Sequence, residues 1–282
     1  MLDSGKEYFP KIGFMQGRLV EKYNSRYQAF PPHSWRQEFE LARELKLPLI
    51  EFIADYENED KNPFFLSYAE LDSLKEIADK NHLKILSICA DYFMKYNLIK
   101  FDSFEINLSS FEVLKLLIKN GKYFGIKTIV LPFVDESSIK SIFREPKVIG
   151  NLKSIIKLFE KEEIECSFEL DLPPDDVLEF VSKFDSEIVK INYDIGNSAS
   201  LGYDCADELS KYGHLINDIH LKDREINGGP VVFGSGASNF EELFKFIFQK
   251  KFSGPIIMQS YRDELGFDIF NQQLNWIKER FL

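Results

Sequence analysis

Eight short apolar runs alternate with helix-like segments along this chain, and that alternation limits the folds open to it. The runs cover residues 11–16, 48–54, 85–90, 127–134, 164–170, 189–195, 216–222 and 255–261. They are nearly continuously apolar, as expected of parallel strands covered on both faces. Eight strand–helix units in strict alternation predict a (β/α)8 TIM barrel. An open doubly wound sheet is the alternative, but it usually needs fewer repeats.

The barrel is expected to form a single domain over residues 1–282. No Pro/Ser-rich linker divides the chain, and α/β barrels commonly reach this length as one domain. Residues 55–66 form a long polar loop after the second strand, where they would border a site. Ser238 with Glu241 forms a capping-box pattern at the start of the seventh predicted helix.

Charge and cysteine content restrict the partners and the compartment. With 35 Lys and Arg against 46 Asp and Glu, the formal charge is −11, and no long basic run is present; both features argue against nucleic-acid binding. The three cysteines are odd in number and widely spaced, which favours a reducing compartment. The sequence has neither a stretch of about 18 apolar residues nor a signal-peptide layout, so we expect a cytoplasmic protein without a membrane segment.

Four polar residues lie at the ends of consecutive predicted strands in the second half of the chain. They are Glu169, Asp194, His220 and Gln259, spaced 25 to 39 residues apart. In a barrel, the carboxyl ends of the strands meet at the active-site mouth, so these side chains would converge. Two carboxylates, an imidazole and an amide oxygen suit one divalent ion, Mn²⁺, Mg²⁺, Co²⁺ or Zn²⁺. The alternative is an ordinary layer of hydrogen-bonded polar residues inside the barrel.

Other residues near predicted strand ends are candidates for binding substrate. Arg18 and Arg262 follow the first and last strands, which are neighbours in a closed barrel, and together would bind an anionic group; either would equally be a solvated surface arginine. Lys222 shares the strand parity of the histidine and would touch substrate oxygens or form a buried ion pair. Asn197 would contact a substrate hydroxyl or make a turn. The glycine-rich loop 228–239 is a weak phosphate-site candidate.

Several motifs together resemble the xylose isomerase-like TIM barrels, in particular the sugar phosphate isomerase/epimerase family. They are IGFMQGRL, IEFIADYENEDKNP, SICADYFM, FELDLP, NYDIGN, DIHLKD and IIMQSYRDE, in that order along nearly the whole chain. The resemblance implies a metal bound by strand-end Glu, Asp, His and Glu. The first three match Glu169, Asp194 and His220. The fourth position departs from the family pattern, because it is Gln259.

The resemblance implies a metal-dependent isomerase or epimerase of a small sugar or sugar phosphate, with Glu169 as the base and the metal polarising a carbonyl oxygen. Gln259 cannot accept a proton at neutral pH, which leaves one base among the four ligand candidates and favours isomerisation over epimerisation. Glu51, Asp55 or Asp91 would supply a second base, and Asp91 is also a candidate substrate contact. Barrels of this group often self-associate, so a homo-oligomer is a further expectation.

Two other functions remain open from the sequence. An endonuclease IV-like phosphodiesterase would need a histidine-rich multi-zinc cluster, but the chain has four histidines and only His220 at a predicted strand end. A catalytically idle barrel that binds a sugar or a partner protein is the other alternative, in which Gln259 marks lost chemistry.

Overall fold

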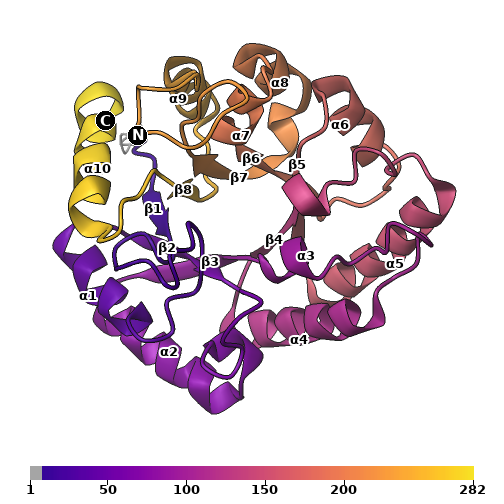
Figure 1. Cartoon of the computed structure of the whole chain (residues 1–282), viewed down its shortest axis with the longest axis horizontal. Coiled ribbons are helices and arrows are strands. Elements are labelled where there is room, and N and C mark those ends of the chain that lie inside the picture. Colours follow the sequence, from indigo (N-terminus) through magenta and orange to yellow (C-terminus); the bar gives the residue numbers. More distant parts are fainter. Residues whose placement is uncertain (1–7) are drawn as a thin grey trace, which may run out of the picture.

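The structure, a computed structural model, describes residues 8–282. Eight parallel strands close into a barrel in sequence order (Figure 1). The predicted TIM barrel is confirmed, and an open sheet is ruled out because β1 pairs with β8 along Ile12–Phe14. The strands are β1 (Ile12–Met15), β2 (Leu49–Ile53), β3 (Lys84–Cys89), β4 (Thr128–Phe133), β5 (Glu165–Leu170), β6 (Val189–Asp194), β7 (Ile216–Leu221) and β8 (Ile256–Met258).

Helices surround the barrel and fill the predicted connections (Figure 1). They are α1 (Trp35–Glu44), α2 (Tyr68–Lys80), α3 (Tyr92–Lys95), α4 (Leu108–Phe124), α5 (Pro146–Glu162), α6 (Pro174–Val181), α7 (Ile195–Ser200), α8 (Cys205–Tyr212), α9 (Phe240–Lys250) and α10 (Phe267–Phe281). The sequence did not predict α3 and α7, which follow β3 and β6 closely. With 4 and 6 residues, they are too short to show a helical period.

The predicted capping box at the start of α9 is wrong. Asn239 is the capping residue, and its side chain accepts a hydrogen bond of 3.1 Å from the backbone N–H of Glu242. The Ser238 hydroxyl instead donates to the backbone carbonyl of Lys222 at 2.9 Å. The helix therefore begins one residue later than predicted, because Ser238 is used to fix the chain that leaves β7.

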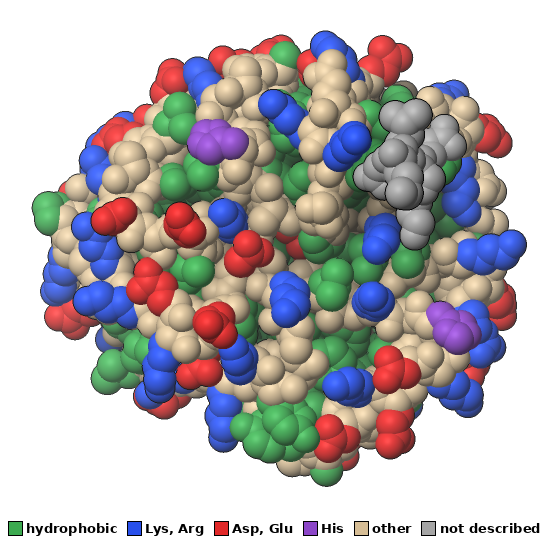
Figure 2. Space-filling model, turned by 180° about the vertical axis from the view of Figure 1, so that it is seen from behind, with side chains coloured by type: hydrophobic (Ala, Val, Ile, Leu, Met, Phe, Trp, Pro, Cys, Tyr) green, Lys and Arg blue, Asp and Glu red, His purple; other side chains and the backbone are tan. Residues whose placement is uncertain are grey.

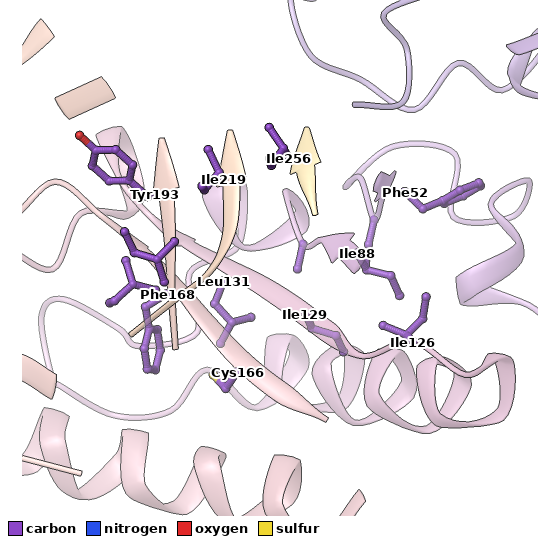
Figure 3. Close-up of a cluster of buried hydrophobic side chains, with 14 of the residues drawn as sticks. Phe52, Ile88, Ile126, Ile129, Leu131, Cys166, Phe168, Tyr193, Ile219 and Ile256 are labelled. Atoms are coloured by element: carbon purple, nitrogen blue, oxygen red, sulfur yellow. The ribbon is translucent and has the colours of Figure 1, made fainter. Parts of the chain in front are cut away.

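Alternate strand residues point outward into a hydrophobic layer between the barrel and its helices. Figure 3 shows Phe52, Phe168, Ile219 and Ile256 in this layer. The residues between them point into the barrel, since successive side chains of a strand face opposite sides. A smaller buried cluster lies on that inner side, formed by Met15, Leu49, Ile53, Cys89, Val130 and Ile257. By the same alternation, the polar residues next to Phe168, Ile219 and Phe52 point into the barrel. These residues are Glu169, His220 and Glu51.

Two observations concern the helices and the charged surface. Within residues 8–282, no helix has both the length and the apolar character needed to cross a bilayer. The face in Figure 2 shows Lys and Arg side chains intermixed with Asp and Glu rather than gathered into a basic stripe.

Candidate metal centre

Three of the four predicted ligands meet at the carboxyl ends of neighbouring strands. Glu169 lies near the end of β5, Asp194 ends β6 and His220 lies on β7, directly opposite Asp194 in the strand register. Each offers one ligand atom, and these atoms all lie within 4.8 Å of one another. All three side chains are buried. This is the distance range in which one cation contacts three ligands at once, so the donor set fits a divalent ion.

The two ring nitrogens of His220 have different surroundings. Nε2 lies 2.8 Å from Oε1 of Glu51, and both side chains are fully buried. Nδ1 has no hydrogen-bond partner among the described residues, although it is buried. Histidines that bind metals commonly donate one N–H to a carboxylate and present the other nitrogen to the ion. Nδ1 is therefore the ligand atom that the structure leaves available.

A row of buried carboxyl groups lies behind His220, inside the barrel. Glu51 accepts a hydrogen bond from the Ser87 hydroxyl, and Asp218 lies close to both Glu51 and His220. Neither oxygen of Asp218 has a donor among residues 8–282. Burial, and then the neighbouring Glu51 carboxylate, raise the pKa of Asp218 well above its ordinary value. Burial therefore favours the neutral form of Asp218, and Glu51 is the carboxyl group that pairs with the histidine.

The charge on His220 depends on the same carboxylate. Burial alone would lower its pKa, but Glu51 outweighs burial and raises the pKa of His220 to about 10. Ligation needs a neutral ring, so a metal that binds here displaces a proton from the imidazole.

Asn197 fixes the side chains of the two acidic ligand candidates, Asp194 and Glu169. Its backbone N–H donates to Oδ1 of Asp194 at 2.8 Å, which caps α7, and its side-chain amide donates to Oε1 of Glu169 at 2.7 Å. Arg224 in turn donates to Oδ1 of Asn197 at 2.9 Å, which fixes the orientation of the amide. Burial, and then the Asp194 carboxylate, raise the pKa of Glu169 to about 7. A carboxyl group with such a pKa suits proton transfer near neutral pH.

Gln259 lies beside the three ligands, but its amide oxygen is already bonded. Lys222 Nζ donates to Oε1 of Gln259 at 2.6 Å and lies 3.3 Å from Oδ2 of Asp194. A Cβ at Gly196 would lie 2.7 Å from the Cβ of Lys222, so only glycine permits this close approach of α7 to the lysine. The ammonium group of Lys222 thus lies beside Gln259. In the family pattern, this position carries a glutamate, which would be the fourth and anionic ligand.

A cavity of about 550 Å³ opens over these residues, with Glu169, Asn197, Lys222 and Gln259 in its wall. Asp91 lines it as well, bonded by the Gln28 amide at 2.7 Å and the Cys89 thiol at 3.1 Å. The polar loop 55–66 contributes Tyr56 to the wall. The volume is in the usual range for small-molecule sites.

The structure does not bring Arg18 and Arg262 to this cavity. Arg18 is fully buried and donates to the Tyr27 carbonyl and the Gln28 side chain, both at 3.0 Å. Arg262 donates to the backbone carbonyls of Gly17 and Val20. Burial, and then the neighbouring Arg18, lower the pKa of Arg262 to about 10. The two arginines lie close together, as predicted for strands one and eight, but they fix the chain after β1.

The sequence of the barrel matches a known family. The model of the xylose isomerase-like TIM barrel family matches residues 39–280. The chain belongs to this family. The resemblance seen in the sequence motifs is thereby confirmed.

Individual relatives of this barrel are distant. L-ribulose-5-phosphate 3-epimerase UlaE of Shigella flexneri serotype 5b (strain 8401) is 21% identical over 245 residues, which cover 81% of this chain and 83% of the epimerase. The D-psicose 3-epimerase of Clostridium cellulolyticum H10, solved with D-tagatose, superposes with a TM-score of 0.68 at 14% identity, covering 95% of this chain and 98% of that one. The IOLI protein with a bound zinc atom gives a TM-score of 0.69 at 18% identity, covering 96% and 99%.

Sequence reasoning missed three groups that shape this site. Asp218 was detectable, because it is an acid two residues before His220 within an apolar strand, and so shares its inward face. Gln28 and Arg224 act from loops far along the chain from their partners Asp91 and Asn197. Strand parity gives no information about such loop residues.

Proposed function

We propose that this chain is a divalent-metal-dependent isomerase or epimerase of a small sugar or sugar phosphate, with Glu169 as the proton-transfer base. The observation that carries the proposal is the convergence of Glu169, Asp194 and His220 to within 4.8 Å, with Glu169 in the wall of a cavity of small-molecule size. Distant relatives whose names are sugar epimerases support the reaction class.

The metal ligands in this proposal are Glu169, Asp194, Nδ1 of His220 and, as fourth, the amide oxygen of Gln259. The ion is one of Mn²⁺, Mg²⁺, Co²⁺ or Zn²⁺, the set suited to oxygen ligands with one imidazole. Bound there, it would supply Lewis-acid polarisation of a substrate oxygen. Gln259 would have to exchange its bond from Lys222 for the ion.

Glu169 carries the proton in the proposed reaction. Its carboxylate takes the proton from the carbon next to the sugar carbonyl; the C–H electron pair becomes the carbon–carbon double bond of an enediolate, and the carbonyl oxygen takes up the negative charge. The hydroxyl proton on the first carbon then passes to the former carbonyl oxygen. The double-bond electron pair takes the proton back from Glu169 at the former carbonyl carbon, and the oxygen on the first carbon becomes the new carbonyl, which gives the isomer. Asn197 holds one oxygen of Glu169, which leaves the other oxygen to accept the proton.

Epimerisation would need a second acid on the opposite face of the sugar. Of the three acids considered from the sequence, Glu51 is bonded to His220 inside the barrel and Asp55 forms a bidentate pair with Arg26. Asp91 lines the cavity, and burial raises its pKa. Asp91 is therefore our candidate for a second proton-transfer group, and Glu169 alone suffices for isomerisation.

Isotope exchange tests the proposed function. In D₂O with Mn²⁺, we expect the wild-type chain to introduce deuterium next to the carbonyl of at least one sugar in a panel of pentuloses and hexuloses, free and phosphorylated. Chelation should stop the exchange and Mn²⁺ should restore it. Exchange that survives complete metal removal would refute the metal requirement. Metal and sugar binding without any exchange would favour the catalytically idle barrel.

Removing the positive charge of Lys222 should strengthen metal binding. Lys222→Met frees Gln259 and Asp194 and removes the repulsion between an ammonium group and a divalent ion, worth about 1 kcal/mol or more per unit charge at contact distances. We expect the Kd for Mn²⁺, measured by calorimetry, to fall about tenfold. Lys95→Met removes the same charge elsewhere in the cavity wall and should change the Kd less than about threefold. An unchanged or weaker Kd in Lys222→Met would show that the lysine does not compete with the ion.

A further inference from the structure

The charged groups of the cavity indicate which form of sugar it takes, a question that rests on the proposed function. Its wall contains more carboxyl groups than cations. The carboxyl groups are Asp91, Asp135, Glu136 and Glu169, and the cations are Arg26, Lys95 and Lys222. A phosphate group needs several hydrogen-bond donors that are not already bonded. Whether the cavity can bind a phosphate therefore depends on the bonds that each cation already makes.

Two of the three cations are already paired. Arg26 donates two hydrogen bonds of 2.8 Å to Asp55, and Lys222 is bonded to Gln259 and Asp194. Lys95, at the exposed rim, is the remaining one without an ion-pair partner within residues 8–282. A single exposed lysine is a poor phosphate site, because its ammonium group offers one point charge and no bidentate geometry.

The glycine-rich loop after β7 has the form of an anion cradle, but a carboxylate of the chain fills it. The backbone N–H groups of Gly234, Gly236 and Ser238 all donate to Asp223, at 2.8, 3.0 and 3.1 Å. Asp223 is fully buried, and a Cβ at Gly236 would collide with its Oδ1. The backbone amides that the sequence suggested as a phosphate site therefore donate to Asp223 instead.

The arginines around the mouth are engaged as well. Arg224 donates to Asn197 and, through two of its nitrogens, to the carbonyl of Gly228. Arg18 and Arg262 donate to protein acceptors after β1, as described above. None of these three lines the cavity. Together with Arg26, each arginine near the mouth is committed to a protein partner in the described part of the chain.

The part of the cavity wall that follows β4 is negatively charged. Asp135 and Glu136 follow β4, are exposed, and have no ion-pair partner among the described residues. Carboxylates accept hydrogen bonds from sugar hydroxyls, but they repel a phosphate dianion across the same distance.

We propose that the cavity takes an uncharged ketose, and that phosphorylated ketoses are excluded by the filled anion cradle and the acidic rim. The hydroxyl groups of the sugar bond to the rim carboxylates Asp135 and Glu136, which line the same cavity as Glu169. The phosphate of a phosphorylated analogue would meet Asp135 and Glu136 without an available pair of donors.

Calorimetry with matched ligands tests this inference without turnover. The probes are D-ribulose, D-fructose and D-tagatose, each beside its terminal phosphate ester, with the full chain in chelator. We expect at least one free ketose to bind, and to bind at least tenfold more tightly than its ester. Tighter binding of the esters, or no binding of any free ketose at 10 mM, would overturn the inference. Free ketoses that bind but never exchange deuterium would refute the proposed function alone; esters that bind and exchange would refute the inference alone.

A double variant tests the role of the rim. Asp135→Asn with Glu136→Gln should shift the ratio of the two affinities toward the phosphate ester by at least threefold. Asp185→Asn with Glu187→Gln makes the same charge change just before β6, at the other end of the barrel, where both residues are exposed. This control should leave the ratio within the error of the wild-type value. An equal shift in both double variants would mean that net charge, rather than the rim, sets the preference.

Discussion

Replacing Glu169 with glutamine should reduce deuterium incorporation into the substrate on the order of 10³-fold, which is the scale of general-base catalysis. Glutamine keeps the shape and still offers an oxygen to the Asn197 amide, but it cannot accept a proton. The rate is measured by NMR at saturating Mn²⁺, with bound metal determined in the same sample. Loss of exchange in a metal-loaded variant then reports on the base and not on an empty site.

The matched control for this prediction lies on the same strand. Glu165→Gln makes the same change at the start of β5, where Glu165 accepts bonds from Thr128 and Asn217 at the opposite end of the barrel. It should leave the exchange rate within about twofold of the wild type, since surface-side polar changes have small effects. Exchange in Glu169→Gln within tenfold of the wild-type rate would remove Glu169 as the base.

Replacing Glu51 with glutamine should weaken Mn²⁺ binding about 10- to 100-fold, the usual cost of losing the carboxylate behind a ligating histidine. The carboxylate accepts from Nε2 of His220, which keeps the hydrogen on that nitrogen and leaves Nδ1 for the ion. A neutral amide fixes this arrangement less strongly. The Kd is measured by calorimetry and the melting temperature is recorded beside it, so that an effect on the ligand is separated from an effect on folding.

Ser87→Ala is the control for the Glu51 prediction. Its hydroxyl donates to the other oxygen of Glu51 and is equally buried, but it does not contact His220. We expect its Kd for Mn²⁺ to stay within about threefold of the wild-type value, because the bond that orients the histidine remains. If both variants lose affinity for Mn²⁺ equally, the loss would come from altered packing inside the barrel and not from a changed orientation of the histidine.

The sequence predicted the barrel and the convergence of Glu169, Asp194 and His220 for the same reason. Strand parity is a local property: an outward apolar residue such as Phe168 or Ile219 forces its neighbour inward, and closure of the sheet brings the inward residues of β5, β6 and β7 together. Both predictions need only the spacing of side chains along each apolar run.

The hydrogen bonds within the site could not be obtained in that way. Lys222 was expected at the mouth, but its bond to Gln259 depends on the rotamers of two long side chains from different strands. Arg262 was expected near Arg18, yet its direction is set by the carbonyls of Gly17 and Val20 in a loop. The helices α3 and α7 have only 4 and 6 residues, too few for a helical period to appear in the sequence.

The ammonium group of Lys222 gives the mouth of this barrel an internal countercharge. It already neutralises part of the negative charge of Asp194, since the two charged groups lie 3.3 Å apart. If the proposed metal site is correct, metal binding would exchange one cation, the Lys222 ammonium group, for another. The occupancy of the centre would therefore follow the supply of metal in the cell and could be reversed without unfolding the protein.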